Sequence, residues 1–470
     1  MELDKDLLAR QEARTLAYRA EYAQKELSRM SQAQLDAIVE AVASAFAAQA
    51  EMLAQMAVQE TGFGNAKDKT VKNQFASRDV MRAIRDMKTV GVLKENPQEK
   101  LWEIGVPVGV IAAIVPSTNP TSTVCYKAMI ALKSGNSIVF SPHPKAINCT
   151  RKAAEIVAQA AESAGAPKGA VDCLSIPAMA GCQELMGAES VRLILATGGP
   201  GMVRAAYSSG KPAIGVGAGN GPAYIHRSAN IEHALRCILR SKTFDYGTVC
   251  ASEQSIIVEA PLEAQVKQVA KTMGFYFMNT EEAGHLAKLL FRPTGALNPE
   301  IVGKSALVLA EKAGFSVPAD TKILVAREQE AGPTRPYSME KLCPVLAFFV
   351  MESEDAVLEK AIEVLTHEGS GHTFALHAED ENVVRKFALQ IPVSRFLVNT
   401  PAALGGIGAT TGLFPALTLG CGAVGGSSSS NNISPLDLIN IRRVAWDNNQ
   451  NQQEDPLVEL LTAKILERLQ

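Results

Sequence analysis

Strand-like and helix-like stretches alternate along most of this chain, and the alternation constrains its fold more than any other feature. From residue 106 onwards, short apolar runs rich in β-branched residues are followed by longer stretches with helical spacing. This pattern predicts an α/β fold, with parallel sheets covered by helices on both faces. Because 470 residues exceed what one core usually accommodates, we expect two such domains.

The first block of this alternation predicts one parallel sheet. Its expected strands are residues 108–115, 137–140, 171–176 and 191–196, and its expected helices are 121–132, 146–163 and 201–209. Ligands bind at the carboxyl ends of strands in such sheets. Two of these ends carry suggestive residues, Ser141-Pro142-His143 and Thr197-Gly198-Gly199. The glycines before a helix suit a bound phosphate, and they equally suit a plain structural turn.

A second block begins after residue 220. Its expected strands are 255–258, 322–326, 345–350, 373–377 and 396–399, with helices at 355–366 and 380–389 among others. Residues 400–446 are rich in glycine and serine, and their composition alone predicts a flexible linker. We divide the chain into 1–220, 221–405, 406–446 and 447–470.

Charge and cysteine content exclude several classes of function. The chain carries 46 basic and 49 acidic residues, a formal net charge of −3, which gives no electrostatic case for nucleic acid. The eight cysteines form no CxxC pair or zinc-type spacing, so we expect free thiols in a reducing cytosol. The charged N-terminus lacks an apolar signal core, and the apolar run at 104–116 is too short to span a membrane.

Two stretches carry the strongest signal for chemistry. Residues 244–254 read FDYGTVCASEQ, with Cys250 just after a glycine turn, and residues 215–222 read GVGAGNGP. Together they resemble the catalytic core of the aldehyde dehydrogenase superfamily, and more narrowly its CoA-acylating branch, the acetaldehyde and propionaldehyde dehydrogenases of bacterial microcompartments. The resemblance covers residues 30 to 446. It implies Rossmann-like parallel sheets, a small oligomerisation segment, an NAD cofactor, coenzyme A as cosubstrate, and homodimers or homotetramers.

The resemblance gives the four segments their expected roles. Residues 1–220 would form the cofactor-binding domain with its N-terminal helices, and 221–405 the catalytic domain. Residues 406–446 resemble a family segment that is ordered and lies near the active site and the subunit interface.

Cys250 is the candidate nucleophile, since the thiolate of a cysteine can add to an aldehyde carbonyl. We expect its surroundings to lower its pKa. The other seven cysteines are expected to be small buried hydrophobic residues. The developing oxyanion needs donors; the backbone amide of Cys250 and the side chain of Asn119 are the candidates. Asn119 is shifted by one position from the family motif, so Thr118 is an alternative, and Asn119 could instead cap the following helix.

Val216 occupies the position at which hydrolysing relatives carry a glutamate that activates water. Valine cannot take a proton, whereas a thiol ionises far more easily than water. The resemblance therefore implies that coenzyme A releases the acyl group. The glycines beside Val216 leave volume for a pantetheine arm.

Further cofactor contacts follow from the resemblance alone. Thr197–Gly199 would lie over the nucleotide phosphates, and Glu340 would hold the nicotinamide ribose, with a solvated surface carboxylate as the alternative. NAD is expected over NADP, although Ser141 and Pro144 replace the family's lysine and glutamate at the adenosine ribose. The expected cofactor-binding residues are Ser117, Thr118, Ser141, Pro142, His143, Thr197, Gly198, Gly199, Gly217 and Glu340.

No metal site is expected. His367, His372 and His377 are spaced five residues apart, which fits neither one helical face nor a zinc motif.

The C-terminal residues form a separate unit. Residues 447–455 are polar and amide-rich, as in a linker, and residues 456–470 place leucine and isoleucine along one stripe of an amphipathic helix. A helix this short is marginal alone. Two interpretations remain open: it docks on its own or a neighbouring subunit, or it is an encapsulation peptide that binds a microcompartment shell protein.

The predicted activity is reversible oxidation of propionaldehyde or acetaldehyde to acyl-CoA, with lactaldehyde still open. The alternatives are a hydrolysing NAD-dependent aldehyde dehydrogenase and a non-catalytic shell-binding scaffold. We expect a cytoplasmic protein, housed in a microcompartment and binding neither membrane nor nucleic acid.

Overall fold

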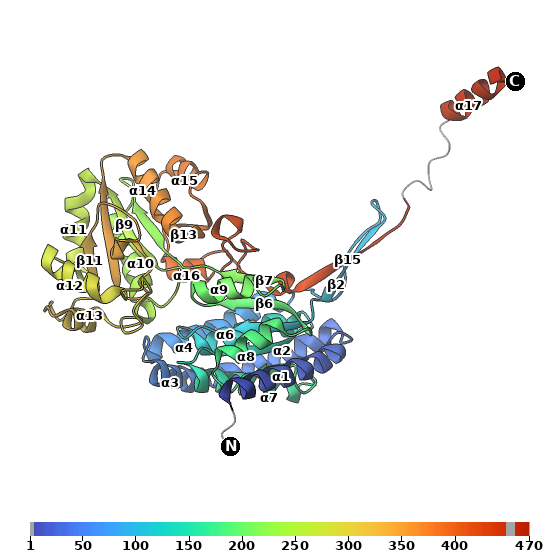
Figure 1. Ribbon diagram of the computed structural model, residues 1–470. Coiled ribbons are helices and arrows are strands. Elements are labelled where there is room, and N and C mark those ends of the chain that lie inside the picture. Colours follow the sequence, from blue (N-terminus) through green and yellow to red (C-terminus); the bar gives the residue numbers. More distant parts are fainter. Residues whose placement is uncertain (1–3, 448–455, 470) are drawn as a thin grey trace.

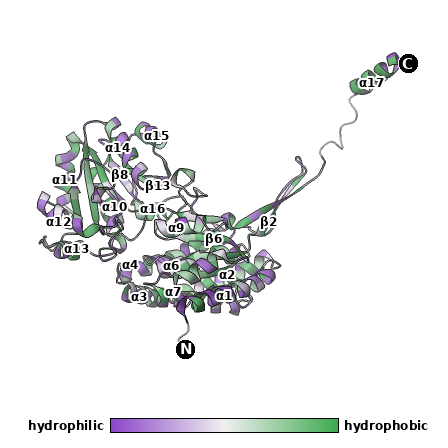
Figure 2. Cartoon of the chain, in the orientation of Figure 1, coloured by the Kyte–Doolittle hydropathy of each residue, from purple (hydrophilic) through white to green (hydrophobic). Residues whose placement is uncertain are grey.

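The computed structural model describes residues 4–447 and 456–469 (Figure 1). Two parallel sheets, of five and seven strands, form the body, and a small antiparallel sheet of three strands extends from it. The predicted α/β fold with parallel sheets is confirmed. Figure 2 shows strands of both parallel sheets in the hydrophobic colour, as expected for strands covered on both faces.

The five-stranded sheet has the order β5-β4-β3-β6-β7. Its strands are β3 (Val110–Ile114), β4 (Ser137–Ser141), β5 (Val171–Cys173), β6 (Val191–Thr197) and β7 (Ala213–Val216). Alternate residues of β3 face opposite cores: Ile111 and Ala113 belong to one cluster, and Val110, Ala112 and Ile114 to the other. This period of two is the geometry of a strand buried on both faces.

Helices cover both faces of this sheet. On one face lie α2 (Gln32–Ala48), α6 (Pro120–Lys133) and α7 (Ile147–Ser163), and on the other α1 (Lys5–Leu27), α8 (Met179–Gly187) and α9 (Pro200–Tyr207). Ser31 and Gln34 form the predicted capping box of α2. The remaining elements before the sheet are α3 (Ala50–Thr61), α4 (Ala66–Gln74), the π-helical turn η1 (Phe75–Asp79) and α5 (Val80–Ile84).

The seven-stranded sheet has the order β10-β11-β12-β9-β8-β13-β14. Its strands are β8 (Gly221–Ile225), β9 (Glu253–Glu259), β10 (Phe275–Phe277), β11 (Ile323–Arg327), β12 (Val345–Met351), β13 (Gly371–His377) and β14 (Val393–Val398). Its helices are α10 (Ile231–Thr243), α11 (Glu263–Thr272), α12 (Thr280–Leu290), α13 (Ala306–Ala313), α14 (Glu354–His367), α15 (Glu381–Ala388) and α16 (Ala402–Gly406). The chain passes from the first sheet to the second between β7 and β8; the domain boundary at residue 220 stays a prediction.

The sequence patterns did not predict the strands that lack a long apolar run. β7 and β8 contain Gly215, Gly221 and Pro222, residues that strands usually avoid, and β10 has only three residues. The antiparallel sheet of β1 (Gly91–Asn96), β2 (Leu101–Pro107) and β15 (Ile439–Ala445) was also missed in part. Its central strand β2 pairs with β15 across more than 300 residues of chain, a separation that no local pattern reveals.

The glycine- and serine-rich segment 406–446 is packed, which composition alone did not predict. Arg395 on β14 is 2% exposed and donates to Gly420 O at 2.7 Å. Ser427 Oγ donates to Gly215 O and Ser428 Oγ to Ala213 O, both at 2.7 Å. Because β7 is an edge strand, these serines bond to carbonyl groups that no further strand pairs; Gly215 O also accepts from Tyr207 OH at 3.4 Å.

The last helix, α17 (Pro456–Leu469), stands apart from the body in Figure 1. Its apolar side chains are exposed, for example Leu461 at 51% and Ile465 at 58%. The predicted linker at 447–455 lies almost wholly outside the described residues. Among the described helices none is alone long and apolar enough to cross a membrane; only the bent pair α2–α3 meets that test together.

The serine contacts on β7 predict a local stability effect. Ser427→Ala together with Ser428→Ala removes two hydrogen bonds worth about 1 kcal/mol each. We expect the segment around residues 420–430 to open at least about tenfold more often. Limited proteolysis under native conditions measures this as faster cleavage there.

The matched control is Ser163→Ala, which removes only a bond within a helix to Gln159 O. Equal cleavage rates in the double variant and in this control would contradict the assignment.

Candidate active site

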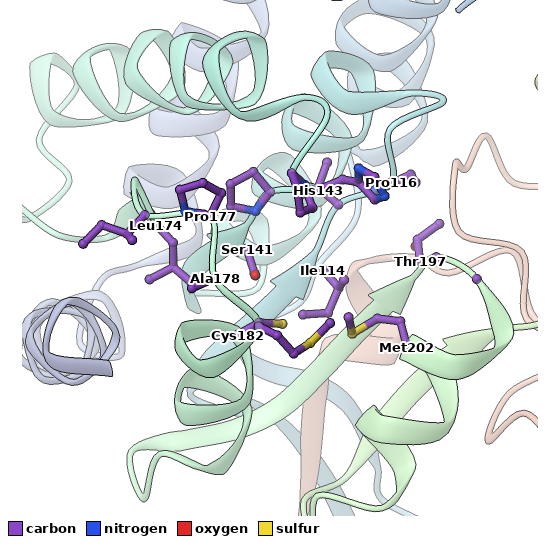
Figure 3. Close-up of a pocket in the computed structure, with 17 residues that line it drawn as sticks. Ile114, Pro116, Ser141, His143, Leu174, Pro177, Ala178, Cys182, Thr197 and Met202 are labelled. Carbon is purple, nitrogen blue, oxygen red and sulfur yellow. The ribbon is translucent and has the colours of Figure 1, made fainter. Parts of the chain in front are cut away.

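The carboxyl ends of three neighbouring strands, β3, β4 and β6, meet at one edge of the five-stranded sheet. The residues that follow them line a cavity of about 100 Å³ (Figure 3). Figure 3 shows Pro116, His143 and Pro177 along one side, with Ile114, Cys182 and Met202 along the other. Burial and then Lys145 lower the pKa of His143, so its ring is neutral at pH 7.

A larger cavity of about 470 Å³ adjoins the first and contains Cys250. The two cavities share Pro116, His143 and the loop Thr197–Gly199 as walls. All twelve residues expected at the site line one cavity or the other: Ser117, Thr118, Asn119, Ser141, Pro142, His143, Thr197, Gly198, Gly199, Gly217, Cys250 and Glu340. The structure therefore brings together residues spread over more than 200 positions.

The loop Thr197–Gly199 has the local geometry of an anion cradle. Gly199 is the N-cap of α9, and Pro200 begins the helix. Thr197 Oγ1 is buried without a hydrogen-bond partner in the protein. A buried hydroxyl without a partner is costly unless a ligand satisfies it, and a helix N-terminus favours an anion.

Cys250 lies between the turn η2 (Phe244–Gly247) and β9. This turn contains two non-glycine residues with positive φ, Asp245 at 48° and Tyr246 at 51°, an uncommon backbone that is held by its surroundings. Burial first, and then Glu340 and Cys421, raise the pKa of the Cys250 thiol to about 12, against a lowering effect of Arg395. The expectation of a lowered pKa was wrong, because the nearest acidic groups and the loss of water outweigh the one cation.

Asn119 stands at the N-cap position of α6, but its side chain makes no capping hydrogen bond. Its Oδ1 accepts from Lys72 Nζ at 2.6 Å, and its Nδ2 donates to Thr248 O at 3.2 Å and to Thr118 Oγ1 at 3.3 Å. The amide nitrogen thus points toward the turn that carries Cys250 and lines the same cavity. This position suits a second donor to an oxyanion, and the helix-capping alternative finds no support in these contacts.

Glu340 is held by backbone groups around the cavity. Its Oε1 accepts from Gly219 N at 2.9 Å, and its own backbone N–H donates to Glu368 Oε2 at 2.6 Å. Burial first and then Glu368 raise its pKa to about 8. Val216, at the end of β7, is 4% exposed and lines the same cavity. Glu340 is the one carboxylate in the described lining of that cavity.

Sequence reasoning missed the charged residues behind Asn119. Lys69 and Lys72 of α4 both donate to Asp245 Oδ2, at 2.8 and 2.5 Å. The two lysines lie three positions apart on one helical face, which was a detectable pattern. Their partner Asp245 lies more than 170 residues away along the chain, so no local signal linked them.

A metal site finds no support within residues 4–447 and 456–469, where no group of three His, Cys, Asp or Glu side chains could hold an ion. His372 and His377 lie on the buried strand β13. Burial first lowers the pKa of His377, to about 4.

Comparisons with known proteins agree with this geometry. A model of the aldehyde dehydrogenase family matches residues 6–276. The chain is similar to the bifunctional aldehyde-alcohol dehydrogenase AdhE of Escherichia coli, with 45% identity over 92% of this chain and 49% of that protein. The chain therefore spans about half the length of that relative.

Among solved structures, the chain resembles an acetylating aldehyde dehydrogenase from Geobacillus thermoglucosidasius, with a TM-score of 0.94, 49% identity, and coverage of 96% of this chain and 100% of that one. It also resembles a propionaldehyde dehydrogenase from a fucose-utilisation microcompartment of Clostridium phytofermentans (TM-score 0.83, 28% identity, 93% and 98% coverage). A third is the propionaldehyde dehydrogenase of Rhodopseudomonas palustris with bound propionyl-CoA (TM-score 0.83, 29% identity, 92% and 94% coverage).

The raised pKa of Cys250 predicts how its reactivity depends on pH. Below a pKa of about 12, the thiolate fraction rises about tenfold per pH unit. In the protein without nucleotide, we expect the rate of Cys250 alkylation by iodoacetamide to keep rising between pH 7 and pH 10. Mass spectrometry of the peptide that contains Cys250 gives this rate.

Glu340→Gln tests how far the charge of Glu340 contributes to the raised pKa of Cys250. The Glu340 carboxyl has a pKa of about 8 and is charged at pH 9, where it opposes the thiolate. The variant should therefore react faster than the wild type at pH 9 and at nearly the same rate at pH 6.5. A wild-type alkylation rate that levels off by pH 8 would show that the pKa of the Cys250 thiol is not raised.

Proposed function

Because the chain belongs to the aldehyde dehydrogenase family, we propose that it converts a short-chain aldehyde to acyl-CoA with a nicotinamide cofactor and coenzyme A. The family resemblance drawn from the sequence is confirmed. One similar structure is an acetylating aldehyde dehydrogenase, and another is a propionaldehyde dehydrogenase with bound propionyl-CoA. The observation that carries the proposal is a half-buried cysteine that lines one cavity with the Asn119 amide and with Val216, which stands in place of a water-activating glutamate.

The chain's own residues account for the carbonyl chemistry. The Cys250 thiol releases its proton to solvent, its sulfur forms a bond to the aldehyde carbon, and the electron pair of the C=O π bond moves to the oxygen, which gains negative charge. In this proposal the Cys250 N–H and Asn119 Nδ2 donate to that oxygen. A bound nicotinamide cofactor supplies the hydride acceptor. The acyl group is then held as a thioester on Cys250 until a second thiol displaces it, which forms acyl-CoA and restores the Cys250 thiol.

The cavities fit a dinucleotide. Thr197 Oγ1 lacks a protein partner and Gly199 opens α9, so this loop would hold phosphate. Glu340 would hold the ribose beside the nicotinamide. The described lining of the smaller cavity contains no lysine or arginine, and a neutral His143 offers no charge to a 2′-phosphate. These features favour NAD over NADP.

Propionaldehyde and acetaldehyde are the proposed substrates. The cavity that contains Cys250 is also lined by the apolar side chains of Val302, Leu342 and Leu417, which suit a short unbranched hydrocarbon. Homodimers or homotetramers are part of the proposal. The antiparallel sheet of β1, β2 and β15, which extends from the body, is the segment proposed to join subunits.

We also propose that α17 is an encapsulation peptide that binds a microcompartment shell protein. Its exposed apolar side chains support this, among them Leu460, Leu461 and Ile465. A similar propionaldehyde dehydrogenase comes from a microcompartment. The location proposed for the protein is the lumen of such a compartment.

An absorbance assay tests the proposed activity. With aldehydes of two to four carbons, we expect NADH to form rapidly only when coenzyme A is present, and NAD to be used better than NADP. Cys250→Ala should lower kcat at least about 10³-fold while nucleotide binding, measured by fluorescence titration, persists. Free acid formed at full rate without coenzyme A would instead establish the hydrolysing activity. If no NADH forms under any condition, the non-catalytic scaffold becomes the favoured alternative.

Removal of residues 447–470 tests the role of α17. The truncated enzyme should keep its kcat within about twofold, because no residue of α17 lines either cavity. A fluorescent protein fused to residues 447–470 should be recruited to shells in cells that assemble them, and Leu461→Glu with Ile465→Glu should abolish recruitment. Loss of activity or of oligomeric state on truncation would favour docking on a subunit.

A further inference from the structure

Three buried charged side chains lie behind Asn119. Lys69 and Lys72 come from α4, and Asp245 from the turn before Cys250; their side chains are 3%, 3% and 0% exposed. None of the three lines either cavity, and none takes part in the chemistry described above. Burying two ammonium groups and a carboxylate is costly, so their contacts with the site need an explanation.

Lys72 uses all of its hydrogen-bonding capacity at this point. Its Nζ donates to Asp245 Oδ2 at 2.5 Å, to Asn119 Oδ1 at 2.6 Å and to Thr248 Oγ1 at 3.0 Å. A lysine ammonium has three donors and no acceptor. The atom of the Asn119 amide that faces Lys72 must therefore be its oxygen.

This contact decides which way the amide points. An asparagine amide can turn by 180° and exchange its oxygen and nitrogen with little change of shape. Beside Lys72 the exchanged orientation would set N–H groups against an ammonium. The nitrogen is thus held on the opposite side, where Nδ2 donates to Thr248 O at 3.2 Å, two residues before Cys250, and to Thr118 Oγ1 at 3.3 Å. The bond to Thr118 is the one that a substrate oxygen would replace, since a hydroxyl can turn away.

We propose that Lys72 is a positioning residue for the reaction: it holds the Asn119 amide with its nitrogen toward the carbonyl oxygen of an aldehyde bound to Cys250. This inference rests on the proposed function. A cation on the amide oxygen also polarises the amide and makes its N–H a stronger donor. The donor is then oriented before the substrate arrives, which is the condition for effective oxyanion stabilisation.

Lys69 provides a matched control on the same helix. It shares Asp245 Oδ2 with Lys72 and is equally buried, but its other bond goes to the backbone carbonyl of Thr118 at 2.8 Å. It makes no contact with the Asn119 side chain. Loss of Lys69 therefore removes one buried charge from the same cluster and leaves the amide orientation unchanged.

Lys72→Met and Lys69→Met separate the two roles. For Lys72→Met we expect kcat for acyl-CoA formation to fall about 100-fold, comparable with loss of one oxyanion donor. The KM for NAD should stay within about threefold, and Cys250 should still be alkylated. Lys69→Met should keep kcat within about threefold. Thermal unfolding of both variants reports their folding. A wild-type kcat in Lys72→Met, or equal losses in the two variants, would overturn the proposal.

A double-mutant cycle with Asn119→Ala distinguishes positioning from a general structural role. Because Lys72 is proposed to act through the amide, Lys72→Met should cause no further loss once Asn119 is alanine. Two losses that multiply would overturn the proposal. Should Lys72→Met not fold, Lys72→Gln enters the same cycle. Its amide can present either oxygen or nitrogen to Asn119 and so no longer fixes that side chain, and the smaller loss of kcat that we expect should likewise vanish once Asn119 is alanine. A wild-type enzyme that forms no acyl-CoA contradicts the proposed function instead, and is seen before any variant is made.

Discussion

The loop that joins the two parallel sheets passes against the backbone of Cys250, and the rest of the site depends on that contact. A Cβ atom on Gly219 would lie 1.7 Å from the carbonyl oxygen of Cys250, so only glycine fits there. β7 ends at Val216 and β8 begins at Gly221, so four residues carry the chain from one sheet to the other. The amide of Gly219 also holds Glu340. One backbone contact thereby sets the nucleophile, the proposed ribose ligand and the junction of the sheets relative to one another.

The ionisable side chains around this junction are buried, and their burial favours the uncharged form of each. Burial first lowers the pKa of Lys341 to about 7 and of Lys242 to about 8, while burial first raises those of Cys250 and Glu340. Arg395 is the cation that favours the Cys250 thiolate, and its guanidinium donates to backbone carbonyls. The protein by itself therefore keeps Cys250 as a thiol, which is less open to oxidation than a thiolate.

Much of the fold could be predicted because its signal was local. Strands such as β3 and β12 are apolar runs, and their neighbours in sequence have helical spacing. β7 and β8 could not be found this way, since the glycines and proline that shape the junction weaken the strand pattern. The packing of residues 420–428 was hidden for a similar reason: composition shows a flexible segment, whereas the order comes from bonds to β7 and to Arg395.

The candidate site shows the same contrast between residues with a local sequence signal and residues that meet only in the folded chain. Residues at the carboxyl ends of strands, such as Ser141 and Thr197, were predictable because parallel strands bring these ends together. The pKa of Cys250 was not predictable, because it depends on burial and on Glu340, 90 positions away in the sequence. The cluster of Lys69, Lys72 and Asp245 was not predictable either, since α4 meets the turn before Cys250 only in the folded chain.

The residues that line the Cys250 cavity also bear on whether water or a thiol accepts the acyl group. To attack a thioester, water must lose a proton to a base, and Val216 offers none. Glu340 is the remaining carboxylate of the described lining, but its Oε1 is bound to Gly219 N–H and its pKa of about 8 leaves it mostly protonated at pH 7. A thiol has an unperturbed pKa near 8.5 and is partly ionised without any base. A cavity without a free carboxylate therefore slows hydrolysis far more than it slows transfer to a second thiol, and this difference in acceptor acidity supports the proposed transfer of the acyl group to coenzyme A.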